Sequence, residues 1–169
     1  MVARQALSTR DFLHEVQQAT LDAIDPSLGS PTAKRVFSSL QIHFGEPRLH
    51  YEVWPVRKTG RIEIGLHIEG PQEWSRQVAA QIAGLADDLR AALGSDYELE
   101  DWTASWCRLH TTLPLTPLTD DLASQVADAT VALIQAAEPL LHDLDLPPLG
   151  PAVEQSPSER RHWRRKRRG

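Results

Sequence analysis

Two short segments of alternating apolar and polar residues constrain the fold of this chain more than any other feature. Residues 49–54 read LHYEVW and residues 61–69 read RIEIGLHIE, so apolar side chains recur at every second position. This period of two predicts strands that bury one face. The intervening RKTG ends in Gly60, where a hairpin turn favours positive φ. Both apolar rows face the same side only if odd positions of the first strand pair with even positions of the second, and a four-residue loop then pairs His50 with His67.

Helical spacing predicts helices on both sides of this hairpin. Ser8, with Asp11 three residues later, is a candidate N-cap for a helix over about 9–24. Ser30 followed by Pro31 predicts the start of a shorter second helix, whose apolar face would hold Phe37, Leu40 and Phe44. A strand over 40–44 is the alternative for that segment.

The second half of the chain predicts two more helices and one more strand. Apolar residues at intervals of three or four predict a helix from about 72 to 93, which Gly94 ends. A third strand is expected within 97–115, with a bulge to reconcile two apolar faces. Thr119 is the expected N-cap of a long last helix, which Pro139 would kink or end.

The predicted order is therefore α-α-β-β-α-β-α. This order is typical of an α+β domain with an antiparallel sheet of about three strands and helices packed on one face. We expect a single domain over residues 1–145. Residues 146–169 are rich in Pro, Ser and charge without an apolar period, which predicts a disordered linker and basic tail.

Charge is divided unequally along the chain. Residues 1–159 hold 11 Lys and Arg against all 23 Asp and Glu, whereas residues 160–169 add seven Lys and Arg. A short basic segment on an acidic body favours contact with nucleic acid, without sequence choice. Trp163 could stack on a base. The candidate nucleic-acid-binding residues are Arg160, Arg161, Trp163, Arg164, Arg165, Lys166, Arg167 and Arg168. The alternative is a solvated end, or one that folds back on the acidic body.

The polar residues of the hairpin are the main candidates for chemistry. Side chains directly opposite each other on antiparallel strands lie about 4.5–5.5 Å apart at Cβ, so His50, His67 and Glu52 could share a metal ion, with His110 as a further ligand. We expect instead that His50, Glu52, Glu63, His67 and Glu69 form only the solvent face of the sheet, with the metal site as the alternative. The single cysteine, Cys107, is expected to be a small buried side chain.

The same face offers a candidate surface for a partner. Trp54, Trp106 and Arg108 could lie there together, and exposed aromatic residues with arginine favour a protein interface or a homodimer. The alternative is that the tryptophans cover one another or pack under the N-terminal helices.

The segments HYEVW, GRIEIGLHIE and EDWTASWCRLH, followed by an amphipathic helix, resemble an uncharacterised prokaryotic family. Its domain is sometimes found beside restriction-type nucleases. The resemblance covers about residues 48–144 and implies an α+β accessory domain in a DNA-related setting. It carries over no catalytic residue. None of Lys34, Lys58 and Lys166 follows an acidic residue at the spacing that such nucleases need.

Together these features favour a small accessory or binding protein rather than an enzyme. Phosphate-binding glycine motifs are lacking, and we expect no cofactor. A secretory signal and a run of 18 apolar residues are also lacking, so we expect a cytoplasmic protein without membrane contact. A metal-binding protein or hydrolase that uses the His and Glu cluster, and a structural homodimer subunit, remain as alternatives.

Overall fold

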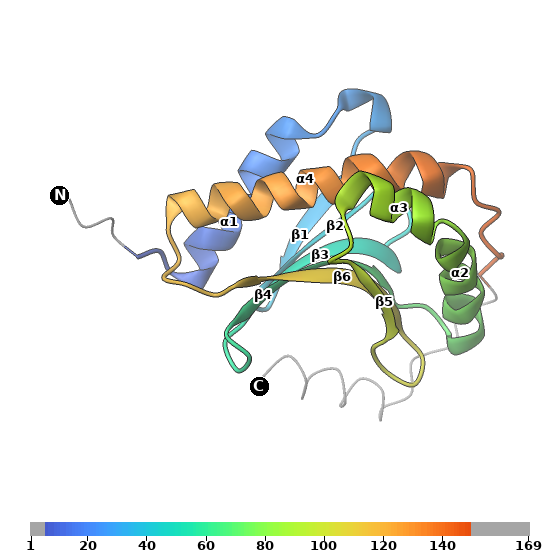
Figure 1. The fold of residues 1–169 in the computed structure, drawn as a ribbon. Helices are drawn as coiled ribbons and strands as arrows, with labels where there is room; N and C mark the ends of the chain where they lie inside the picture. The colour runs from blue at the N-terminus through green and yellow to red at the C-terminus, as the bar shows by residue number, and fades with distance from the viewer. Residues whose placement is uncertain (1–5, 150–169) are drawn as a thin grey trace.

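An antiparallel sheet with helices on one face forms the fold (Figure 1). The computed structural model describes residues 6–149. Within them the strand order is β1-β2-β3-β4-β6-β5. The strands are β1 (Thr32–Val36), β2 (Ser39–His43), β3 (Leu49–Val56), β4 (Arg61–Ile68), β5 (Glu98–Asp101) and β6 (Cys107–Pro114). The helices are α1 (Thr9–Ala23), α2 (Gln72–Gly84), α3 (Ala86–Leu93) and α4 (Asp120–His142), with a 3-10 turn, η1, over Pro26–Leu28.

The central hairpin and the outer helices agree with the sequence prediction. Strands β3 and β4 pair antiparallel with His50 opposite His67. The Ser8 side chain caps α1 by accepting from the Asp11 backbone N–H. Thr119 caps α4 in the same way, by accepting from the Leu122 backbone N–H. The α+β class and the antiparallel sheet are therefore confirmed.

The predicted size of the sheet is wrong, because six strands are present among the described residues rather than about three. The segment expected to form a second helix is instead the β1–β2 hairpin. Its Leu40 and Ile42 face the core and pair with Val53 and Tyr51 of β3. The spacing of Phe37, Leu40 and Phe44 fits a helix, whereas Leu40 and Ile42 fit a strand, and only the pairing with β3 decides between the two.

Two further segments differ from the prediction. The expected third strand is two strands, β5 and β6, which pair with each other. The expected helix over 72–93 is divided into α2 and α3 at Leu85, directly after Gly84, a residue of low helix propensity. Pro139 does not end α4, which continues to His142.

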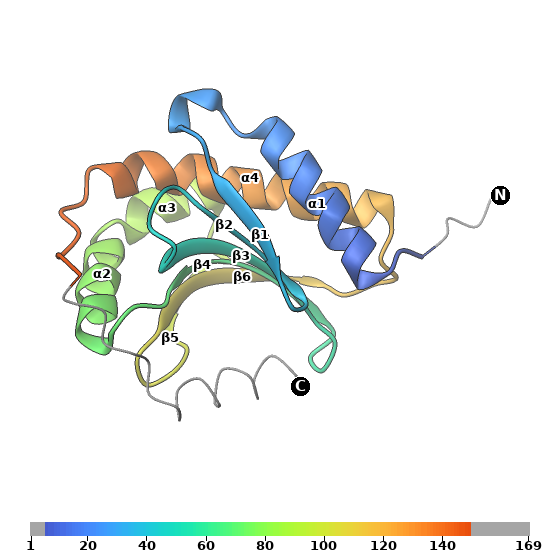
Figure 2. The same ribbon diagram turned by 180° about the vertical axis from the view of Figure 1, so that it is seen from behind.

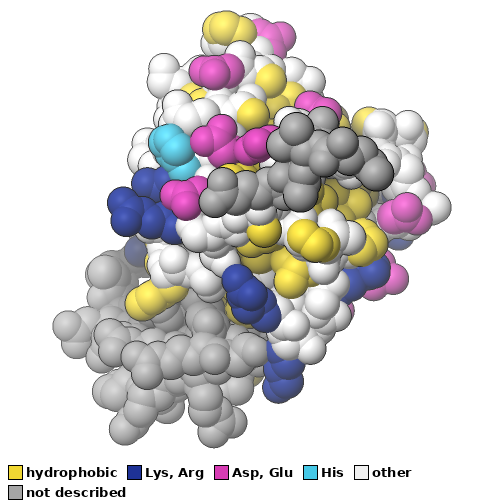
Figure 3. Space-filling view, turned by 90° about the vertical axis from the view of Figure 1, so that its left-hand side faces the viewer, with side chains coloured by type: hydrophobic (Ala, Val, Ile, Leu, Met, Phe, Trp, Pro, Cys, Tyr) yellow, Lys and Arg dark blue, Asp and Glu magenta, His cyan; other side chains and the backbone are white. Residues whose placement is uncertain are grey.

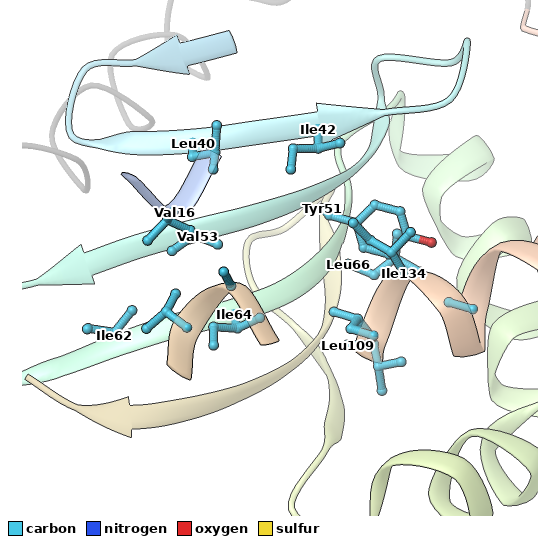
Figure 4. Close-up of a cluster of buried hydrophobic side chains, with 14 of the residues drawn as sticks. Val16, Leu40, Ile42, Tyr51, Val53, Ile62, Ile64, Leu66, Leu109 and Ile134 are labelled. Carbon is cyan, nitrogen blue, oxygen red and sulfur yellow. The ribbon is translucent and has the colours of Figure 1, made fainter. Parts of the chain in front are cut away.

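The hydrophobic core lies between the sheet and its helices. Figure 4 shows Ile62, Ile64 and Leu66 of β4 among the side chains that fill this layer. Helices α1 and α4 lie side by side over the sheet, and α2 and α3 cover its other end (Figures 1 and 2). No helix within residues 6–149 is long and apolar enough to cross a membrane.

Candidate metal centre

The sheet face opposite the helices carries a cluster of buried polar side chains. Alternation along β3, β4 and β6 places His50, His67 and Arg108 in one row across the sheet. The expectation of a solvent face is wrong, because His50 and His67 are 2% and 0% exposed and Glu52 is 1% exposed. Buried charged groups are costly unless they are paired or bind metal, so this cluster needs a physical explanation.

The loop between β5 and β6 covers part of this cluster. The Trp102 ring lies edge-on to the His67 ring, with centroids 4.9 Å apart, and the Arg108 guanidinium lies over the Trp102 ring. Trp102 also contacts Trp54 and Trp106, which are 7% and 8% exposed. The tryptophans thus cover one another, and Trp54, Trp106 and Arg108 do not form the exposed aromatic surface that the sequence suggested for a partner.

Four candidate ligand atoms converge between β3 and β4. They belong to His50, Glu52, His67 and Glu69 and lie within 4.8 Å of one another. His50 Nε2 is 3.2 Å from Glu52 Oε2 and 3.9 Å from Glu69 Oε1. His67 Nδ1 is 3.1 Å from Glu69 Oε1 and 3.9 Å from Glu52 Oε2. Ligand atoms about 2.0–2.1 Å from a tetrahedral ion are about 3.3 Å apart, so a small contraction would bring these four into coordination.

The remaining polar atoms of these side chains are held by other groups. His50 Nδ1 lies 2.9 Å from the carbonyl oxygen of Pro47, which can only accept, so Nδ1 donates and Nε2 is directed at Glu52. His67 Nε2 lies 2.9 Å from Glu63 Oε1. Gln41 donates to Glu52 Oε2 at 2.9 Å. A backbone carbonyl or carboxylate on the far nitrogen of a histidine is the usual arrangement around a metal ion.

The electrostatics of the cluster explain how it is held together without metal. Burial by itself lowers the pKa of His67, but the Glu52 charge and the hydrogen bonds with Glu63 and Glu69 outweigh it and raise that pKa to about 10. His67 is therefore an imidazolium at neutral pH. Burial would raise the pKa of Glu63, but the hydrogen bond with His67 and the charges of His67 and Arg108 lower it.

Formal charge within the cluster is unbalanced. Arg108 forms ion pairs with Glu63 and Glu100, so two cations, Arg108 and His67, face four carboxylates that include Glu52 and Glu69. The formal excess is two negative charges. A divalent cation bound at His67 Nδ1 would displace the proton of that imidazolium, so it would reduce this excess to one negative charge.

The structure separates His110 from the other predicted metal ligands. Its Nε2 lies 3.0 Å from Glu100 Oε1, in a second group with Glu98. Burial and the Arg108 charge lower the pKa of His110. Glu69 takes the place in the first group that sequence reasoning gave to His110. It could have been found from the sequence, because it continues the alternation of Glu63 and His67.

Gly65 sets the spacing within the cluster. It lies between Glu52 and His110 in the adjacent strands, and a Cβ added there would be 2.8 Å from His110 Cβ and 2.9 Å from the Leu109 carbonyl oxygen. We expect Gly65→Ala to lower the free energy of unfolding by about 1–3 kcal/mol, measured by urea denaturation, because the central strands must move apart.

Gly84→Ala is the control for Gly65→Ala. Gly84 is the last residue of α2, and a Cβ there meets nothing within 4 Å. The change should leave the stability unaltered or raise it by up to about 1 kcal/mol. A Gly65→Ala protein as stable as the parent would contradict the close approach of β4 and β6.

Cys107 is not among the residues of this cluster. Cys107 is buried, as expected, and burial and its contact with Asp101 raise the pKa of its thiol to about 11. A thiol of this kind is a poor nucleophile at neutral pH. The basic tail residues 160–169 lie outside the described residues.

Comparison of the chain with protein-family models, curated proteins and solved structures finds no match. The function is therefore inferred from the residues and geometry of this chain.

Proposed function

We propose that the protein binds one divalent transition-metal ion, Zn²⁺ by ligand type, through His50, Glu52, His67 and Glu69. One observation carries this proposal: the ring nitrogens that face away from the four-atom group are bound to Pro47 and Glu63, so His50 Nε2 and His67 Nδ1 face the two carboxylates. Polar side chains that only cover a sheet face would not need hydrogen bonds that orient both imidazole rings in this way.

The ligand set favours a closed site. Two imidazoles and two carboxylates are within the usual ligand repertoire of Zn²⁺. Four protein ligands complete a tetrahedral shell, whereas a hydrolytic zinc site keeps one position for water. His50, Glu52 and His67 are also almost fully buried. The arrangement therefore supports metal binding for structure or regulation over metal-assisted hydrolysis.

Titration of the chelator-treated full-length protein with Zn²⁺ in a calorimeter tests this proposal. We expect one equivalent to bind, and Glu69→Gln to weaken binding at least about tenfold because the amide carries no charge. His110→Gln is the matched control and should change the affinity less than about twofold, since His110 belongs to the other group. Absence of Zn²⁺ binding, or equal loss in both variants, would refute the assigned site.

Nucleic-acid contact is a second candidate function, carried by residues 160–169. Seven cations in ten residues, with Trp163 among them, supply the charge density that neutralises phosphates. The acidic remainder of the chain would oppose contact with a duplex, so the affinity for duplex nucleic acid should come from this segment.

Deletion of residues 160–169 should abolish binding to random duplex DNA at low salt. For the full-length protein we expect the logarithm of the binding constant to fall steeply with the logarithm of salt concentration, because each phosphate contact releases a counterion. Fluorescence anisotropy over a salt series measures both. Equal binding by the full-length and shortened proteins would remove this role from the segment.

A further inference from the structure

A second site lies at the end of the sheet where α1 begins. It is a pocket of about 550 Å³, within the usual size range of small-molecule sites, and it shares no residue with the four-ligand metal group. The start of α1, the β1–β2 turn and the end of β3 line it. Figure 3 faces this end of the molecule, where Lys and Arg side chains lie around hydrophobic surface.

Three arginines make this pocket positively charged, whereas residues 1–159 as a whole carry a negative net charge. Arg10, Arg35 and Arg57 line it from α1, β1 and the β3–β4 turn, and no Asp or Glu lines it among the described residues. Arg57 donates to Thr9 Oγ1 at 3.0 Å, which holds its guanidinium beside the first turn of α1. The amino end of this 15-residue helix adds partial positive charge there. Guanidinium groups bind phosphate oxygens in pairs, so the lining fits a phosphate.

The β1–β2 turn adds an aromatic ring to the lining of the pocket. Phe37 has φ 55°, a left-handed conformation that bulky residues rarely adopt, and it is the one non-glycine residue with positive φ in the described chain. Its side chain also lines the pocket and is 70% exposed. Val36 pairs with Ser39, so Phe37 and Ser38 form a two-residue hairpin turn, whose favoured types need positive φ at the first position. This turn brings the Phe37 ring to the pocket, where it could contact a ligand.

We propose that this pocket binds an organic phosphate with a flat ring, namely a nucleotide, either free or as a unit of a single strand. The arginines would hold the phosphate, and the Phe37 ring would contact the base. Stacking on aromatic side chains is tolerant of base identity, so affinity should depend weakly on which base is present.

Titration of the full-length protein with four probes tests the proposal: ADP, adenosine, inorganic phosphate and an eight-nucleotide single strand. We expect ADP to bind at least tenfold more tightly than adenosine or phosphate alone. The double variant Arg10→Gln/Arg35→Gln should lose at least tenfold in ADP affinity. The matched control is Arg76→Gln/Arg90→Gln, which removes two exposed arginines on α2 and α3 and should have no effect.

Phe37→Gly separates binding from folding. Glycine accepts the positive φ, so the melting temperature should stay equal or rise while ADP affinity falls severalfold. Arginine-dependent binding of the single strand more tightly than ADP would identify a unit of nucleic acid as the ligand, and the reverse order would identify a free nucleotide. The proposal is overturned if neither ADP nor the strand binds, or if the pocket and control variants bind them equally.

Discussion

His67→Gln is expected to lower the free energy of unfolding of the metal-free protein by about 3–5 kcal/mol, the usual cost of breaking a buried ion pair. His67 is completely buried, and its ring nitrogens lie 2.9 Å from Glu63 and 3.1 Å from Glu69. Removing the imidazolium leaves buried carboxylates with less opposing charge. Urea denaturation at pH 7 in the presence of a chelator measures the change.

His110→Gln is the control for this loss. The pKa of His110 is lowered by burial and by the Arg108 charge, so its ring is neutral at pH 7 and balances no carboxylate. We expect it to cost about 1 kcal/mol or less. If both variants lose the same stability, the loss is one of packing, and the cationic role of His67 is wrong.

The stability of the metal-free protein should fall as pH rises from 6.5 to 9. The folded-state pKa of His67, about 10, is above its ordinary value of 6.5. Its contribution is therefore fully present below pH 6.5 and is lost as pH rises toward and through 10, by up to about 1.4 kcal/mol per pH unit. The window ends at pH 9 because the pKa values of Cys107 and Tyr97 are also raised, and both then contribute.

His67→Gln supplies the control for the pH dependence. The variant has no group at this position that binds a proton, so its stability should change much less between pH 6.5 and 9. Urea unfolding of both proteins at three pH values in this window decides the point. Parallel curves for the parent and the variant would show that another group causes the fall.

The local sequence pattern was sufficient to predict the strands with a long alternation and the helices with a recognisable N-cap. Alternation over eight residues in each of β3 and β4 determined the hairpin and the pairing of His50 with His67. Ser8 and Thr119 marked the starts of α1 and α4, because a cap is a local hydrogen bond. The short strands were predicted less well, because so short an alternation does not exclude a helix. Strand β1 was missed, β2 was only the alternative to a helix, and β5 was not distinguished from β6.

The candidate metal centre also has a part that the local sequence pattern predicted and a part that it did not. The sequence by itself placed His50, Glu52 and His67 on one face, because side chains alternate across a strand. It did not show that this face is buried, since the Trp102 cover comes from a loop far along the chain. The alternation also put Glu69 on this face, but only the tertiary structure showed its carboxylate 3.1 Å from His67, paired His110 with Glu100 and aligned Glu63 behind His67. Cross-strand contacts and burial decide these positions, and neither is a local property of the sequence.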